Sequence, residues 1–176
     1  MEQLSALLEQ SAHRVVDPYF SVPIAGGRPA LRERVYCYEL YHQLRCHWPI
    51  DAGYVLNGEL DKAAHPVLHG RGIGRLKPDL LVHRPGDMNG NHAIIEVKCS
   101  NAPGRGIRKD LRSLAMFRQR ADYRRAILLI FGNDANRTLA RATRIAAELG
   151  PLPTIEIWLH PSVGARATYA RSVGSC

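Results

Sequence analysis

The apolar positions of this chain change period along its length, and these changes divide it into predicted helices and strands. Apolar residues that recur every three or four positions predict helices, whereas alternation or a short continuous apolar run predicts a strand. Prolines and glycines mark segment ends: Pro49 closes one helix, and Gly150 with Pro151 closes another. The predicted order is helices over 2–13 and 29–46, strands over 52–60, 79–83 and 93–98, a helix from 107, a strand over 126–131, a helix from 133 to 150 and a strand over 154–160.

This order predicts an α/β (α+β) fold in which helices flank a mixed β-sheet. The segments 79–83 and 93–98 are joined by turn residues, so we expect them to pair as an antiparallel hairpin. The run 126–131 is apolar throughout, which is typical of a central strand buried on both faces. We expect a single domain over 1–176, with an N-terminal helix and loop over 1–28, a core over 29–132 and a C-terminal helix, strand and tail over 133–176.

Composition favours a soluble protein with a polyanionic partner. No apolar run approaches the ~20 residues needed to cross a membrane, and the N-terminal segment lacks the features of a secretory signal. We therefore expect a cytoplasmic protein with no membrane partner. The four cysteines form no close pairs, so we expect reduced thiols. The formal net charge is +8, and each Lys or Arg placed on a phosphate releases counterions, so the basic excess favours a polyanionic partner.

A candidate site combines Asp79, which follows Pro78, with Glu96 and Lys98 on the next predicted strand. Residues two apart on a strand point to the same face, about 6.6 Å apart, so Glu96 and Lys98 project together. The start of one hairpin strand lies near the end of the other, which brings Asp79 beside them. A bound divalent metal would remove the repulsion between the two carboxylates. The alternative is an ion pair on a solvated strand face.

Pro78-Asp79 followed by Glu96-Val97-Lys98, on a hairpin that precedes a helix, resembles the PD-(D/E)XK, or restriction-endonuclease-like, nuclease superfamily. The resemblance implies a core in the order α-β-β-β-α-β over residues 30–132, here followed by a further helix and strand. It implies Asp79 and Glu96 as metal ligands, with Mg²⁺ as the cofactor and Mn²⁺ as its substitute. It also implies Lys98 as the catalytic lysine, which orients or activates the attacking water.

Many members of this superfamily place a glutamate on the helix before the sheet, and Glu39 fits that place as a further catalytic residue and metal ligand. Glu59, at the end of the first predicted strand, competes for the same role. Members also reach the site from the helix after the Glu-x-Lys strand, where Lys109 and Asp110 lie; Lys109 is a candidate phosphate contact. A solvent-facing glutamate on an amphipathic helix is the alternative for Glu39.

The basic excess gathers in loops and a helix start that flank the predicted hairpin. Segments that enter and leave a sheet at the same end tend to line one cleft, so we expect these side chains to follow a phosphate backbone. The candidate nucleic-acid-binding residues are Arg71, Arg75, Arg105, Arg108 and Lys109.

The sequence therefore predicts a metal-dependent endonuclease that hydrolyses phosphodiester bonds, with DNA as the expected substrate. One site cuts one strand, so a double-strand cut requires a homodimer or two binding events. The chain could also serve as one component of a defence, repair or mobile-element system. A non-catalytic nucleic-acid-binding or protein-interaction module on the same fold is the alternative function.

Overall fold

The computed structural model describes residues 3–59, 70–74 and 76–175. Its helices are α1 (Leu4–His13), α2 (Asp17–Phe20), α3 (Glu33–Cys46), α5 (Gly104–Ala121) and α6 (Ala135–Leu149). Its strands are β1 (Val55–Gly58), β2 (Leu80–His83), β3 (Asn91–Cys99), β4 (Arg125–Phe131), β5 (Ile155–His160) and β6 (Thr168–Val173), with a 3₁₀ turn (Met88–Gly90) before β3.

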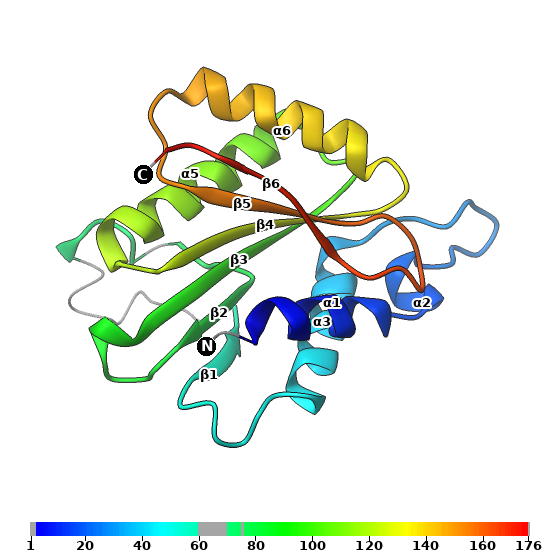
Figure 1. Cartoon of the computed structure of the whole chain (residues 1–176). Coiled ribbons are helices and arrows are strands. Elements are labelled where there is room, and N and C mark those ends of the chain that lie inside the picture. The colour runs from blue at the N-terminus through cyan, green and yellow to red at the C-terminus, as the bar shows by residue number, and fades with distance from the viewer. Residues whose placement is uncertain (1–2, 60–69, 75, 176) are drawn as a thin grey trace.

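The strands form one six-stranded mixed sheet that lies between two layers of helices (Figure 1). Helices α1, α2 and α3 cover one face of the sheet, and α5 and α6 cover the other. The predicted α+β architecture, a mixed sheet flanked by helices, is confirmed at this level.

Consecutive strands are neighbours in the sheet, in the order β1-β2-β3-β4-β5-β6. The β1–β2 and β2–β3 pairs are antiparallel, the β3–β4 and β4–β5 pairs are parallel, and β6 returns antiparallel to β5. The predicted hairpin is therefore present, with Leu80 opposite Ile95. Because parallel strands need a crossover, α5 and α6 connect β3 to β4 and β4 to β5.

The side chains of β3 divide the core into its two halves. Ile95, Val97 and Cys99 pack in the cluster under α1 and α3, whereas Ile94 packs in the cluster under α5 and α6. Since side chains alternate along a strand, the face that carries Ile94 also carries residues 96 and 98. The two charged residues of β3 therefore point toward the α5 layer.

Several segments differ from the prediction: α2 lies within the expected N-terminal loop, and α5 begins at Gly104 rather than at 107. Residues after Pro29 are extended, because Ala30 pairs with Val22, and α3 begins only at Glu33. The predicted C-terminal tail contains β6, an edge strand that pairs with β5 through its backbone. Its side chains are nearly all exposed, so no alternation of apolar and polar residues marked it as a strand.

Two further expectations concern the membrane and the cysteines: no membrane partner, and reduced thiols. In the part of the chain that the structure covers, no helix is both long and apolar enough to span a bilayer. Cys37, Cys46 and Cys99 carry free thiols, and those of Cys37 and Cys99 are buried.

Candidate functional site

Asp79 immediately precedes β2 and links this strand to both of its neighbours. Its backbone carbonyl accepts a hydrogen bond from the Glu59 amide at 3.0 Å, directly after β1. Its carboxylate Oδ2 accepts one from the Val97 amide of β3 at 2.7 Å. The register of β2 on β3 continues from Leu80 opposite Ile95, which places Asp79 beside Glu96. The structure thus brings Asp79 to the strand that carries Glu96 and Lys98.

Helix α5 meets β3 through two matched pairs of side chains. Glu96 and Lys98 are two apart on the strand, and Asp110 and Ser113 are three apart on the helix, so each pair shares a face of its element. Ser113 Oγ donates to Glu96 Oε1 at 2.8 Å. Asp110 Oδ2 lies 2.8 Å from Lys98 Nζ. Asp110, rather than its neighbour Lys109, therefore contacts the predicted catalytic lysine.

Glu33 reaches the same point from the other layer of helices. As the first residue of α3, it extends over the end of β3, and its Oε2 lies 2.9 Å from Lys98 Nζ. Its second oxygen, Oε1, accepts from the Cys99 amide at 3.3 Å and from the Cys99 thiol at 3.1 Å. Lys98 is therefore held between α3 and α5, and its side chain is only 12% exposed.

Burial perturbs the ionisation of both predicted metal ligands. Desolvation, opposed by the hydrogen bond from Val97, raises the pKa of Asp79 to about 6. Desolvation also raises the pKa of Glu96 well above its usual value, and the charges of Asp79 and Asp110 raise it further. The physical cause is shared: several carboxylates lie together in a poorly solvated place, where each disfavours ionisation of the others.

Lys98 differs from the two carboxylates, because its surroundings favour its charged form. Burial opposes its charge, but the contacts with Asp110 and Glu33 outweigh burial, and the pKa of Lys98 lies above its ordinary value. Lys98 is therefore an ammonium ion at neutral pH. In this state it can donate hydrogen bonds to a water or a phosphate oxygen, but it cannot accept a proton.

The carboxylates of Asp79 and Glu96 suit a hard divalent cation. In the described ranges, no group of three His, Cys, Asp or Glu side chains is spaced to hold a metal ion by itself. Mg²⁺ does not require such a group, since it keeps several waters and is commonly bound through one or two carboxylates plus substrate phosphates. Burial and the neighbouring carboxylates raise the pKa values of Asp79 and Glu96 more than Lys98 lowers them, and a bound cation would favour their ionised forms.

The two glutamates that competed for the third metal position differ in location. Glu39 accepts a hydrogen bond from Gln43 at 2.7 Å, one turn further along α3, and it is not among the charges that act most strongly on Asp79 or Glu96. Glu59 lines a cavity of about 300 Å³ together with Asp79. Its carboxylate lies 3.5 Å from Arg34 Nε. The structure thus groups Glu59, but not Glu39, with Asp79.

Glu33 was missed because Glu39, nearer the middle of the predicted helix, already fitted the place of the superfamily's glutamate. The helical spacing of buried residues could have indicated Glu33. It lies two turns before Leu40, on the side of the helix that also carries the buried residues Tyr36 and Leu44. Glu39 does not lie on this side. A phase argument would have favoured Glu33.

The candidate nucleic-acid-binding residues separate into two groups. Arg71 donates to the Arg120 carbonyl at 2.7 Å and lies 3.6 Å from Asp122, at the C-terminal end of α5. Arg105 lies in the first turn of α5, about 22 Å away along the helix axis. Arg71 therefore does not line one cleft with Arg105, Arg108 and Lys109, and Arg75 lies outside the described residues.

Comparisons with known protein families, with curated proteins and with solved structures found no match for this chain. Functional inference therefore rests on the geometry and electrostatics of the site.

We predict that replacing Glu96 by glutamine stabilises the metal-free protein increasingly as the pH rises. The folded pKa values of Asp79 and Glu96 are raised, so the stability that each contributes is complete below its unfolded pKa, about 4, and is lost as the pH rises through its folded pKa, which is about 6 for Asp79. A neutral amide in place of the Glu96 carboxylate would remove part of this loss. Thermal unfolding in EDTA from pH 5 to pH 8 should give a growing Tm difference between Glu96→Gln and the wild type.

Glu39→Gln is the matched control, since Glu39 lies on α3 outside this cluster of carboxylates. Its Tm should follow that of the wild type at every pH. About 1 kcal/mol shifts the Tm of a protein of this size by roughly 2–4 °C, which is easily measured. A Tm difference for Glu96→Gln that does not change with pH would contradict the raised pKa values.

Proposed function

We propose that this protein is a metal-dependent nuclease that hydrolyses phosphodiester bonds, with DNA as its substrate. One observation carries the proposal: two carboxylates with raised pKa values, the buried Glu96 and the partly buried Asp79, lie near the Lys98 ammonium at the end of β3. The agreement of the strand order with a PD-(D/E)XK core supports it.

In this proposal Asp79 and Glu96 hold Mg²⁺, for which Mn²⁺ can substitute. The bound ion would lower the pKa of a water and polarise the phosphoryl oxygens. The Ser113 hydroxyl, 2.8 Å from Glu96 Oε1, fixes the orientation of that carboxylate. The Val97 amide does the same for Asp79.

Lys98 acts as a hydrogen-bond donor in the proposed reaction. Because Asp110 and Glu33 keep it protonated, it can orient the attacking water or stabilise negative charge on a phosphate oxygen. The activation of water by direct proton transfer to Lys98 is disfavoured by its raised pKa. Asp110 and Glu33 are thus positioning residues for Lys98.

The charge of the protein supports a polyanionic substrate. The net charge of +8 favours a polyanion, and Arg105, Arg108 and Lys109 lie at the start of α5, close to Asp110. One site cuts one strand. A double-strand cut would need a homodimer or a place in a larger defence, repair or mobile-element assembly.

A specific observation favours a second candidate, a non-catalytic nucleic-acid-binding or protein-interaction module. Lys98 already pairs with two carboxylates, so the cluster could serve as a buried ion network that joins α3, β3 and α5. A protein that carries such a network in place of an active site would bind its partner without catalysis. The metal dependence of cleavage separates the two functions.

We predict that the purified protein cleaves DNA with Mg²⁺ or Mn²⁺ and is inactive in EDTA. Lys98→Met should abolish cleavage and leave metal binding largely intact, because an ammonium is not a ligand. Asp79→Asn should lose both. Gel assays of cleavage, paired with calorimetric metal titrations, would measure these losses. Cleavage by metal-stripped protein would eliminate the metal mechanism, and metal binding without cleavage under any condition would favour the non-catalytic module.

We predict that Glu33→Gln lowers the cleavage rate by roughly 10- to 100-fold, the usual cost of losing a group that orients an active-site residue. Loss of this carboxylate also lowers the pKa of Lys98, so the alkaline limb of the pH–rate profile should move to lower pH. Glu39→Gln, on the same helix, is the control and should leave rate and profile unchanged. If Glu39→Gln impairs cleavage and Glu33→Gln does not, the assignment of Glu33 is wrong.

A further inference from the structure

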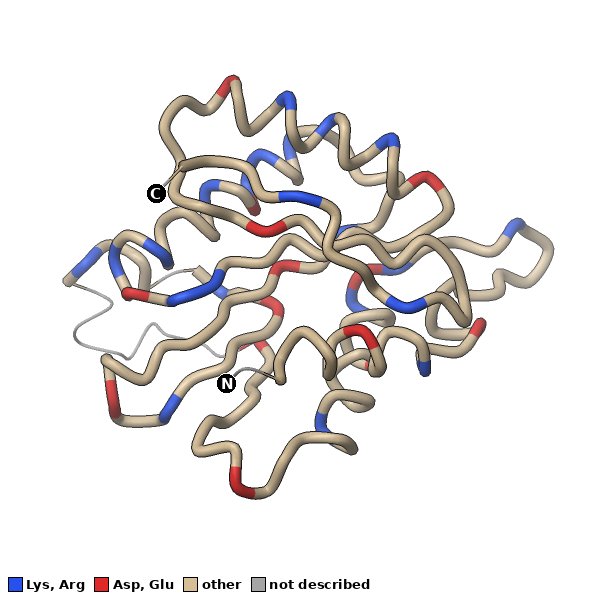
Figure 2. Tube along the Cα trace, in the orientation of Figure 1, with Lys and Arg blue, Asp and Glu red and all other residues tan. Residues whose placement is uncertain are grey.

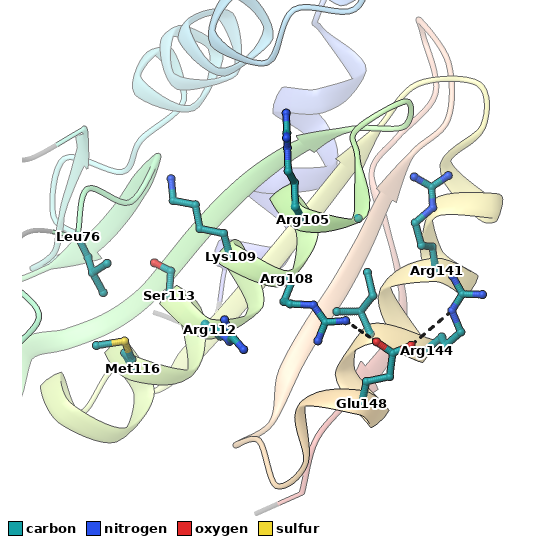
Figure 3. A pocket seen from close by; sticks show the side chains of 12 residues that line it. Leu76, Arg105, Arg108, Lys109, Arg112, Ser113, Met116, Arg141, Arg144 and Glu148 are labelled. Atoms are coloured by element: carbon teal, nitrogen blue, oxygen red, sulfur yellow. Dashed lines mark hydrogen bonds and ion pairs between the residues drawn. The ribbon is translucent and has the colours of Figure 1, made fainter.

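A groove of about 620 Å³ runs between α5 and α6, on the face of the sheet that Glu96 and Lys98 point toward (Figure 3). Its lining is strongly basic. The charged residues that line it are Arg105, Arg108, Lys109 and Arg112 from α5, and Arg141, Arg144 and Glu148 from α6. Among these described residues, six cations face a single carboxylate. Figure 2 shows the same concentration of basic positions along both helices.

The protein neutralises this charge only in part. Glu148 contacts Arg108 and also lies 3.8 Å from Arg144, so one carboxylate serves two guanidinium groups. Arg141 Nη1 donates to the Ala102 carbonyl at 2.6 Å, which satisfies a hydrogen bond but supplies no negative charge. The groove therefore keeps a net positive charge in a concave surface, where the field is focused.

The start of α5 adds to the imbalance. No acidic residue lies in its first turn, and its cap makes no side-chain hydrogen bond. The positive end of the helix dipole thus faces Arg105 without compensation, an arrangement that is unfavourable for the protein alone. An anion in the groove would interact favourably with the dipole and with the basic side chains.

The groove adjoins the candidate site. Ser113 lines the groove and donates a hydrogen bond to Glu96. Lys109, which also lines it, precedes Asp110, the residue that contacts Lys98. The groove therefore lies next to the stretch of α5 that contacts Glu96 and Lys98.

We infer that the α5–α6 groove binds the sugar-phosphate backbone of a nucleic-acid strand and leads it to Asp79, Glu96 and Lys98. The inference rests on the proposed function for the choice of nucleic acid as the polyanion. It assigns phosphate contacts to Arg112, Arg141 and Arg144. Glu148 is an internal competitor: a phosphate must displace it from Arg108 and Arg144.

The test measures binding separately from cleavage. Fluorescence anisotropy of labelled single-stranded and duplex DNA oligonucleotides, in EDTA and at several salt concentrations, gives the slope of log K against log salt. Arg112→Ala with Arg144→Ala should weaken binding and flatten this slope by up to about 1.4 for single strands or about 1.8 for duplex. The control, Arg14→Ala with Arg45→Ala, removes two exposed arginines from the α1–α3 layer and should leave the slope unchanged.

Glu148→Gln tests the same surface in the opposite direction. It releases Arg108 and Arg144 from their shared carboxylate, so it should tighten DNA binding by up to about fivefold. This variant keeps the shape of the side chain and every arginine. Tighter binding here, together with weaker binding in the arginine variant, excludes loss of folding as the explanation.

Three results would overturn the inference. They are an unchanged salt slope in the Arg112–Arg144 variant, an equal change in the Arg14–Arg45 control, and displacement of DNA by polyglutamate as effectively as by unlabelled oligonucleotide. A groove that does not bind DNA is distinguishable from a protein that does not cleave DNA. Cleavage with an unchanged slope would refute the groove alone, whereas a flattened slope without metal-dependent cleavage would support the groove and refute the enzyme.

Discussion

The ammonium group of Lys98 joins three elements of the fold at one point. It extends from the end of β3 and lies 2.9 Å from Glu33 on α3 and 2.8 Å from Asp110 on α5. Because Lys98 is mostly buried, removal of either partner would leave part of its charge without compensation in a poorly solvated place. The pairing of this charge therefore helps to hold α3 and α5 at the C-terminal end of β3.

The same cluster carries an excess of negative charge. Four carboxylates, those of Glu33, Asp79, Glu96 and Asp110, lie near one ammonium and act on one another. Without a cation, this excess and burial raise the pKa values of Asp79 and Glu96, which favours their protonated forms. A bound divalent metal would balance the negative charge while both carboxylates stay ionised. The electrostatic problem and the proposed activity therefore have one physical origin.

The α5–α6 groove has the opposite imbalance: among the described residues that line it, six are cationic and one is a carboxylate. The proposed metal site thus adjoins a surface with a net positive charge. A phosphodiester with its metal ion would satisfy both at once. Helix α5 connects the two, because Asp110 and Ser113 face the carboxylates while Arg105 and Arg112 face the groove.

The sequence predicted the parts of this account that depend on local pattern. The apolar run of β4 and the turn residues between β2 and β3 were sufficient to expect a mixed sheet with a hairpin. The hairpin then placed Asp79 near Glu96, and strand periodicity placed Lys98 on the same face as Glu96. Glu33 was not predicted, although it lies on the buried side of α3, because its contacts with Lys98 and Cys99 join segments far apart in the sequence. Contacts between distant segments were also beyond local pattern. Whether Lys109 or Asp110 faces the sheet depends on the rotation of α5 about its axis, which is fixed by packing in the core. The side chains of β6 show no pattern of burial, since backbone hydrogen bonds hold this strand at an exposed edge.

The most direct test of the central claim is a calorimetric titration of Mn²⁺ into the wild-type protein at pH 5 and pH 8, in buffers of different ionisation enthalpy. If Asp79 and Glu96 bind the metal and must first lose protons, binding should be strong at pH 8 and much weaker at pH 5. At pH values near or below the pKa of Asp79, about 6, metal binding should release protons into the buffer. Binding that is independent of pH, or that persists unchanged in Asp79→Asn, would contradict the account.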